Sequence, residues 1–369
     1  MAITRLGPNQ DITAAKIAGT INFKNLIING DMSLAQRGTT VTGITGGGYN
    51  TVDRMNVFLG SMGTWTHTQS TTVPTGQGFA NSLKIDCTTA DASPASGDYH
   101  IFGQKIEGQM LQYLKKGTSN AESVTISFWV RSNKTGTYTF EMQDVDNSRQ
   151  ISKTYTIDSA DTWEKKTITI EGDTSGGFGN DNSNDCQVNW WLGAGSAWSS
   201  GTLNTSWGTT TQANRVSSSQ VNLADSTSNE WLITGMQMEV GTSASDFEFL
   251  PYDVNLQRCK RYFQVIADGA SPSEFFASVS NYNGTYIFGT YRFMPEMRSA
   301  PTISSVTGTN YYAVNVNSTA DSFNEVKGQD ADSRSCQLYA DANVSGTAGH
   351  SGQMKSDNAS AKVTADAEL

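Results

Sequence analysis

Apolar and polar residues alternate along many short segments between residues 26 and 248, which is the pattern of half-buried β-strands. The clearest segment is SVTISFWVRS, where one face is apolar and the other carries hydroxyls, Trp129 and Arg131. Similar segments are TYTFEMQD, KTYTI, TWEKKTITIEG, CQVNWWLG and WLITGMQMEVG. Gly-, Ser- and Asn-rich loops separate them. Many short strands divided by turns predict an antiparallel jelly-roll β-sandwich over residues 26–250.

The pattern changes at NLQRCKRYF, residues 255–263, where Leu256, Cys259, Lys260 and Phe263 follow helical spacing. We expect a short helical connector there. Further strand-like segments are FFASVS, TYIFGTYRF, TNYYAVNV, SCQLYADAN and AKVTADAEL. They predict a smaller C-terminal β domain over residues 251–369, so that the whole chain is all-β.

Residues 1–25 contain no long periodic run and include the breaker Gly7-Pro8. Two interpretations remain open: an arm that attaches to a neighbouring chain, or a frayed terminus.

Composition supports a β protein and excludes several partners. The formal net charge is −10, which argues against nucleic acid because phosphate binding needs a basic surface. Only 16% of residues are charged while 10% are aromatic, and neutral Thr, Ser, Asn and Gly fill the difference. No stretch approaches a membrane span, and the first residues lack the features of a signal peptide. The four Cys are widely spaced, which favours isolated buried thiols of a chain made in a reducing compartment and leaves disulfides unsupported.

Several ordered motifs resemble bacteriophage tail fibres that carry a jelly-roll, carbohydrate-binding-module-like domain. The resemblance begins with NLIINGDMSLAQRGTT, followed by Tyr49 and Asp53-Arg54, although Met55 stands where that family usually has Trp. It continues through IFGQKIEG, SFWVRS, TWEKKTITIEG, WWLGAGS, TGMQMEVG, DFE..PY, QRCKRYF, PEMRSAPT and the final DAEL. The opening MAITRLGP is similar to tail proteins from phages of marine bacteria.

The resemblance implies a virion protein of the phage tail, made in the cytoplasm of the host bacterium. It implies a homotrimer that binds other tail proteins through residues 1–25 and a glycan or other receptor on the host surface. It supplies no defined set of ligand residues.

Sugar recognition needs flat apolar rings for pyranose faces and amides or carboxylates for hydroxyls. Strand alternation places such groups on outward faces, and two Trp lie in the Gly/Ser/Thr-rich loop. The candidate ligand-binding residues are therefore Trp129, Glu141, Asn189, Trp191, Trp198 and Trp207. The competing interpretation is that these rings cover a second apolar layer, pin a loop or contact another subunit.

The segment GNDNSNDC is rich in oxygen ligands, and Asp181 and Asp185 imitate the spacing of an EF-hand loop. An EF-hand is excluded, because Cys186 stands where Gly is needed and Leu192 where Glu is needed. A structural Ca²⁺ of another geometry is weighed against an ordinary Asx-rich turn, and no other cofactor is expected.

No hydrolase motif or nominated pair of carboxylates is present, so we expect no enzyme. The favoured function is a structural and adhesive virion component, most simply a tail fibre. The alternatives are a tail- or capsid-decorating protein without ligand binding, and a glycan depolymerase.

Overall fold

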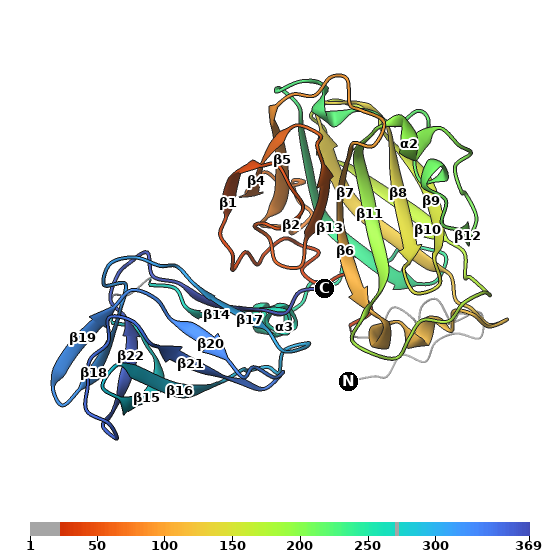
Figure 1. Cartoon of the computed structure of the whole chain (residues 1–369). Coiled ribbons are helices and arrows are strands. Elements are labelled where there is room, and N and C mark those ends of the chain that lie inside the picture. The colour runs from red at the N-terminus through yellow and green to blue at the C-terminus, as the bar shows by residue number, and fades with distance from the viewer. Residues whose placement is uncertain (1–22, 270–272) are drawn as a thin grey trace, which may run out of the picture.

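The computed structural model describes residues 23–269 and 273–369. Figure 1 shows a large β-sandwich and a smaller blue β unit, which meet beside the short helix α3. The all-β class is confirmed, with antiparallel sheets throughout the named strand pairs. The predicted arm lies mostly outside the described residues. Its last three residues belong to the sandwich, where Asn25 donates from its side chain to the Met236 carbonyl.

Two antiparallel sheets form the sandwich. The six-stranded sheet has the order β1 (Thr40–Ile44), β4 (Thr64–Ser70), β5 (Ser82–Thr89), β13 (Glu230–Val240), β7 (Val124–Ser132), β10 (Glu164–Ile170). The seven-stranded sheet has the order β12 (Gly208–Thr209), β9 (Arg149–Ile157), β8 (Gly136–Asp144), β11 (Asn184–Ala194), β6 (Tyr99–Glu107), β3 (Asn56–Gly60), β2 (Gly48–Tyr49). Short helical turns connect them: η1 (Gly108–Met110), η2 (Gln112–Leu114), α2 (Ser196–Ser199), η3 (Gln212–Asn214), η4 (Leu223–Asp225).

The core between the two sheets follows the predicted alternation. In β11, Val188, Trp190 and Leu192 enter the core cluster, as do Ile126 and Phe128 of β7. The opposite side of β11 therefore faces away from the core, and this places Asn189 and Trp191 on the outer face of the seven-stranded sheet.

The predicted connector helix is present, but it begins and ends three residues earlier than the predicted segment 255–263. Helix α3 spans Tyr252–Lys260 and follows Pro251, while Phe263 already begins strand β14. The prediction that the helix reaches Phe263 is wrong, because Cys259 and Tyr262 end the segment in an apolar cluster with Ile28 and Leu34.

The C-terminal unit contains two further antiparallel sheets around its own core. The three-stranded sheet is β14 (Phe263–Ala267), β23 (Val363–Asp366), β17 (Thr302–Ser305). The seven-stranded one is β19 (Thr319–Phe323), β18 (Tyr312–Val316), β22 (Ser351–Ser356), β15 (Phe275–Asn283), β16 (Tyr286–Arg292), β21 (Ser335–Ala340), β20 (Lys327–Gln329).

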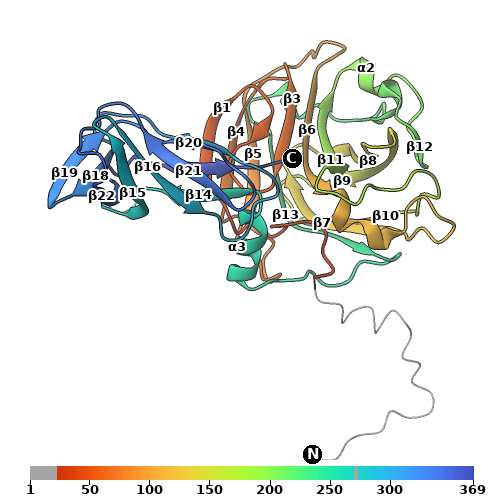
Figure 2. The same ribbon diagram turned by 60° about the horizontal axis from the view of Figure 1, so that its bottom comes forward.

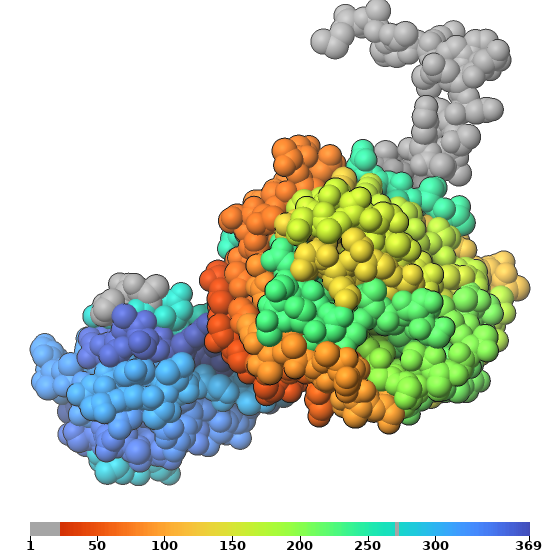
Figure 3. All heavy atoms as spheres, turned by 90° about the horizontal axis from the view of Figure 1, so that it is seen from above, coloured from red at the N-terminus to blue at the C-terminus, as the bar shows by residue number. Residues whose placement is uncertain are grey.

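Buried charges hold the two units against each other. Glu368, after β23, pairs with Arg54 of the sandwich, and both side chains are almost fully buried. Arg261 forms a two-pronged ion pair with Glu107 at 2.8 and 2.7 Å. Figures 2 and 3 show the blue unit seated against the side of the sandwich formed by the red and orange strands.

All four cysteines are free and buried, which confirms the interpretation as isolated thiols. Among the described residues, no helix combines the length and hydrophobicity that a membrane crossing would need.

Candidate functional site

Four of the six predicted ligand residues come together on the outer face of the seven-stranded sheet of the sandwich. Asn189 and Trp191 of β11 lie beside Glu141 of β8, because Asn189 and Glu141 are direct partners in the register. The short helix α2 brings Trp198 over them, with 5.6 Å between the Trp191 and Trp198 ring centroids. The segment after α2 adds Arg215, whose guanidinium carbon lies 5.1 Å from the Trp191 ring centroid.

Arg215, Asn189 and Trp191 together donate four hydrogen bonds to the Glu141 carboxylate. Arg215 donates to both oxygens, at 2.7 and 2.8 Å. Asn189 and Trp191 donate to Oε2 at 3.1 and 3.2 Å. Glu141, Asn189 and Trp191 are all buried, so the expectation of an open patch at these three side chains is wrong. Four donors on one carboxylate hold the loop on the sheet, and the burial of Glu141 keeps that group away from a sugar hydroxyl.

The accessible part of this face lies beside that buried group. Phe58, Tyr99 and Trp198 are only partly buried and pack around Ile101 and Trp191. Tyr99 and Trp198 meet edge to face, with 5.1 Å between their centroids. These three rings, which we call the outer-face aromatic patch, come from β3, β6 and α2.

Polar groups with unused bonding capacity border the outer-face aromatic patch. Asn56 and Asn189 are both register partners of Gly103, one from each neighbouring strand. The side-chain oxygens of both asparagines are buried without a hydrogen-bond partner among the described residues. Both oxygens are closed off from solvent, so a ligand does not reach them where these side chains lie. Lys105 adds a cation 5.3 Å from the Phe58 centroid, and burial lowers the pKa of its ammonium group.

Trp129 is placed elsewhere. It lies on β7 in the six-stranded sheet, half-buried beside Gly235, where a side chain would come within 3.1 Å of the Trp129 ring. Phe79, next to it, forms an aromatic cluster with Phe247 and the exposed Phe249. Trp129 therefore cannot share a ligand with Trp191 across the thickness of the sandwich.

Trp207 and Trp198 both anchor loops. Trp207 donates to the Glu171 carbonyl at 2.8 Å, and Trp198 donates to the Gly97 carbonyl at 3.0 Å. Both rings remain half-buried. Each indole thus fixes its loop and keeps part of one ring face toward solvent.

Asp181 lies in the loop before β11, and Asp185 lies at the start of that strand. Asp185 is fully buried, Asp181 is exposed, and Asp146 from the β8–β9 turn lies nearby. Burial, together with the negative charges of Asp146 and Asp181, raises the pKa of Asp185 to about 6. Asp181 also accepts from the Ser183 backbone N–H at 2.8 Å, as in an ordinary Asx turn, whereas both carboxylate oxygens of Asp185 lack such a partner among the described residues.

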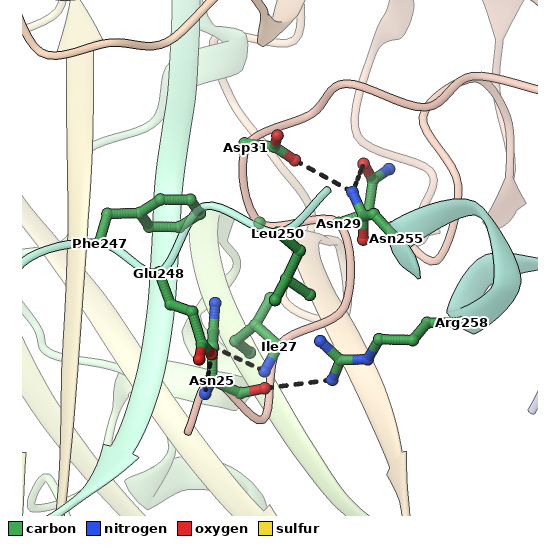
Figure 4. A pocket seen from close by; sticks show the side chains of 10 residues that line it. Asn25, Ile27, Asn29, Asp31, Phe247, Glu248, Leu250, Asn255 and Arg258 are labelled. Atoms are coloured by element: carbon green, nitrogen blue, oxygen red, sulfur yellow. Dashed lines mark hydrogen bonds between the residues drawn. The ribbon is translucent and has the colours of Figure 1, made fainter. Parts of the chain in front are cut away.

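A small pocket lies where residues 25–31 meet segment 247–258 (Figure 4). Glu248 accepts from the Asn25 backbone, and Arg258 donates to the Asn25 carbonyl. Its volume is about 10 Å³, which matches a single water molecule at most. The pocket is therefore too small for a sugar, and the hydrogen bonds around it hold residues 25–31 against segment 247–258.

Sequence reasoning missed Phe58, Tyr99, Asn56 and Arg215. Alternation in NVFLG and YHIFGQKIE carries the signal for the first three, because Asn56 and Phe58 lie on one face of β3 and Tyr99 on the matching face of β6. Arg215 comes from an irregular loop and pairs 74 positions away in sequence, so no local pattern points to it.

No family model matches this chain, and no curated protein matches it. Solved structures similar to it include the enzymatically active domain of bacteriophage CBA120 tailspike protein 4, at 13% identity and a TM-score of 0.31 over 59% of this chain and 22% of that chain. Another is a putative sugar binding protein from Bacteroides thetaiotaomicron, at 13% identity and a TM-score of 0.32 over 59% and 100%. A third is the module TmCBM61 solved with β-1,4-galactotriose, at 8% identity and a TM-score of 0.28 over 59% and 99%. Scores this low carry no function to the present chain.

Proposed function

We propose that this chain is a structural and adhesive component of a tailed-phage virion that binds a glycan of the host surface. The observation that carries the proposal is the outer-face aromatic patch, with its three partly exposed rings and the Lys105 ammonium group beside Phe58. Rings of this kind cover the C–H faces of a pyranose. The ordered tail-fibre-like motifs support the virion context, with residues 1–25 as the attachment to other tail proteins.

We expect low affinity at each single site and high affinity for the assembled, multivalent fibre. A partly exposed patch without a deep pocket buries little of a sugar, so single-site affinity is low. Several copies in a homotrimeric fibre, and several fibres on a virion, multiply that affinity through effective concentration. The proposal includes no catalysis, because Glu141, the carboxylate within this group, already accepts four hydrogen bonds.

The test is a glycan microarray that carries bacterial surface polysaccharides, probed with the full-length chain. We expect Trp198→Ala and Phe58→Ala to lower the binding signal at least about ten-fold, the size expected when a stacked ring is lost. The matched control is Trp129→Ala, a half-buried ring on the opposite sheet, which should leave binding unchanged. Loss in the Trp129 variant alone would move the site to the six-stranded sheet.

Two alternatives give different results in the same preparation. A decorating protein without ligand binding predicts no array signal at any polysaccharide, together with incorporation into virions. A glycan depolymerase predicts release of reducing sugar from the bound polysaccharide. Light scattering on the same sample measures whether the chain is a trimer.

A further inference from the structure

Three carboxylates gather at the end of the sandwich where β8 turns into β9 and where β11 begins. The reference point is the position that a Cβ would take on Gly179. It lies 3.0 Å from Asp185 Oδ2, 3.2 Å from Asp146 Oδ2 and 3.6 Å from Asp181 Oδ2. Segments 33 or more positions apart in the sequence therefore bring negative oxygens to one place.

Two glycines leave the space that these oxygens occupy. A Cβ on Gly108 would stand 2.1 Å from Asp185 Oδ2 and 2.3 Å from the Gly179 carbonyl oxygen. Any larger residue at position 108 would displace both oxygens. The cradle consequently holds a main-chain carbonyl as well as carboxylates.

The negative charge in this cradle has no counter-charge in the described part of the chain. Neither oxygen of the fully buried Asp185 has a hydrogen-bond partner in bonding geometry, and none of the three carboxylates forms an ion pair with Lys, Arg or His there. The neighbouring carboxylates differ: Asp144 pairs with Lys116, and Asp173 pairs with Lys116 and Arg149. A buried carboxylate without a partner is costly, so its retention calls for a cation.

We propose that Asp146, Asp181, Asp185 and the Gly179 carbonyl bind a divalent cation of the hard, oxygen-preferring class, with Ca²⁺ as the fitting ion. Ca²⁺ takes carboxylate and carbonyl oxygens at about 2.3–2.6 Å in flexible geometry and accepts water at the remaining positions. As the described side chains lie, no group of three or more His, Cys, Asp or Glu residues could hold a metal ion, so binding at this place requires side chains to move. Asp185 is fixed by burial, whereas Asp146 and Asp181 are exposed, so their side chains turn inward when the ion arrives.

The experiment is scanning calorimetry of chelator-treated full-length protein, with and without CaCl₂, together with calorimetric titration of Ca²⁺. We expect one Ca²⁺ per chain. The sandwich unfolding midpoint should rise by about 5 °C or more at a Ca²⁺ concentration a hundred times its dissociation constant. Asp185→Asn and Asp146→Asn should each abolish the rise.

Two comparisons make the result decisive. Asp330→Asn changes an exposed carboxylate of the C-terminal unit and should keep the full response to Ca²⁺. In chelator, Asp185→Asn should unfold at no lower temperature than the unchanged chain, because the amide removes a buried unpaired charge; this shows that the variant folds. No rise with Ca²⁺ in the unchanged chain, or an equal rise in all variants, would overturn the proposal.

Discussion

Two buried histidines illustrate how single residues tie stability to pH. His67 on β4 and His100 on β6 both face the core, and His100 packs against Trp65 with 4.2 Å between the ring centroids. Both ring nitrogens of His100 and Nε2 of His67 lack hydrogen-bond partners among the described residues. Burial lowers the pKa of His67 to about 4, and burial together with the nearby His67 holds the pKa of His100 well below its ordinary value. The folded chain therefore holds both rings neutral.

This predicts acid sensitivity over a defined pH range. Below the ordinary His pKa of 6.5, the unfolded chain binds protons that the folded chain does not bind. The free energy of unfolding therefore falls as the pH drops from 6.5 toward 4. His67 alone accounts for a loss of about 3 kcal/mol across that range. Urea unfolding at several pH values measures it. His100→Phe should flatten the profile, whereas His350→Gln at an exposed site should not; an unchanged profile in the His100 variant contradicts the assignment.

At the scale of elements, the buried Glu141–Arg215 pair holds an irregular loop on a regular sheet. Glu141 is fully buried on β8, and the Arg215 side chain is 13% exposed. The loop between α2 and η4 also sits on the sheet through backbone bonds, such as Ser152 N–H to the Asn204 carbonyl at 2.7 Å. The sheet thus supplies the flat base, and helix α2, at the start of this loop, supplies the ring of Trp198.

Breaking one half of this pair should cost more than removing both halves. Arg215→Met leaves a buried carboxylate without its cation and should lower the free energy of unfolding by about 3–5 kcal/mol. The double variant Glu141→Gln, Arg215→Met should recover most of that loss, because no charge is then left alone. Denaturant unfolding of Arg215→Met, Glu141→Gln and the double variant, each compared with the unchanged chain, forms the cycle. Additive losses would mean that the two side chains act independently.

The elements themselves follow from local pattern to different degrees. Alternation predicts which side of β11 enters the core, because the period of a strand is fixed by its pleat. Helix α3 begins directly after Pro251. It ends where Tyr262 packs against Ile28 and Leu34, a tertiary contact that helical spacing does not encode. The burial of Trp191 depends on Arg215 arriving from a distant loop, so its outward direction is predictable while its exposure is not.

At the scale of the whole molecule, the two units depend on buried charges at their contact. Glu368 lies between Arg54 and Arg37, and burial raises the pKa of its carboxyl group despite both cations. Arg54 also lies over the Tyr262 ring, 3.4 Å from its centroid. The Asp53-Arg54 and DAEL motifs, far apart in sequence, therefore meet at one interface.

Removing Glu368 should loosen that interface. Glu368→Ala leaves Arg54 buried without its partner, so we expect a loss of about 3–5 kcal/mol and faster proteolysis between the units. Limited proteolysis followed by mass spectrometry locates the cut. Glu325→Ala, which removes a partly exposed partner of Lys327, is the matched control, and proteases should cut this variant at the original rate. Equal rates in both variants would contradict a role for Glu368 in joining the units.

The position of strand β13 affects how the chain folds while it is being synthesised. It is the last strand of its sheet along the chain, yet it pairs with both β5 and β7 in the middle. While the ribosome is still making residues before Glu230, the sheet exists as two halves with open edges toward the missing strand. Such edges attract other nascent chains, so this is the interval in which a chaperone matters most. Any expressed fragment that stops before β13 keeps both edges open and should aggregate, whereas one that includes Val240 closes the sheet.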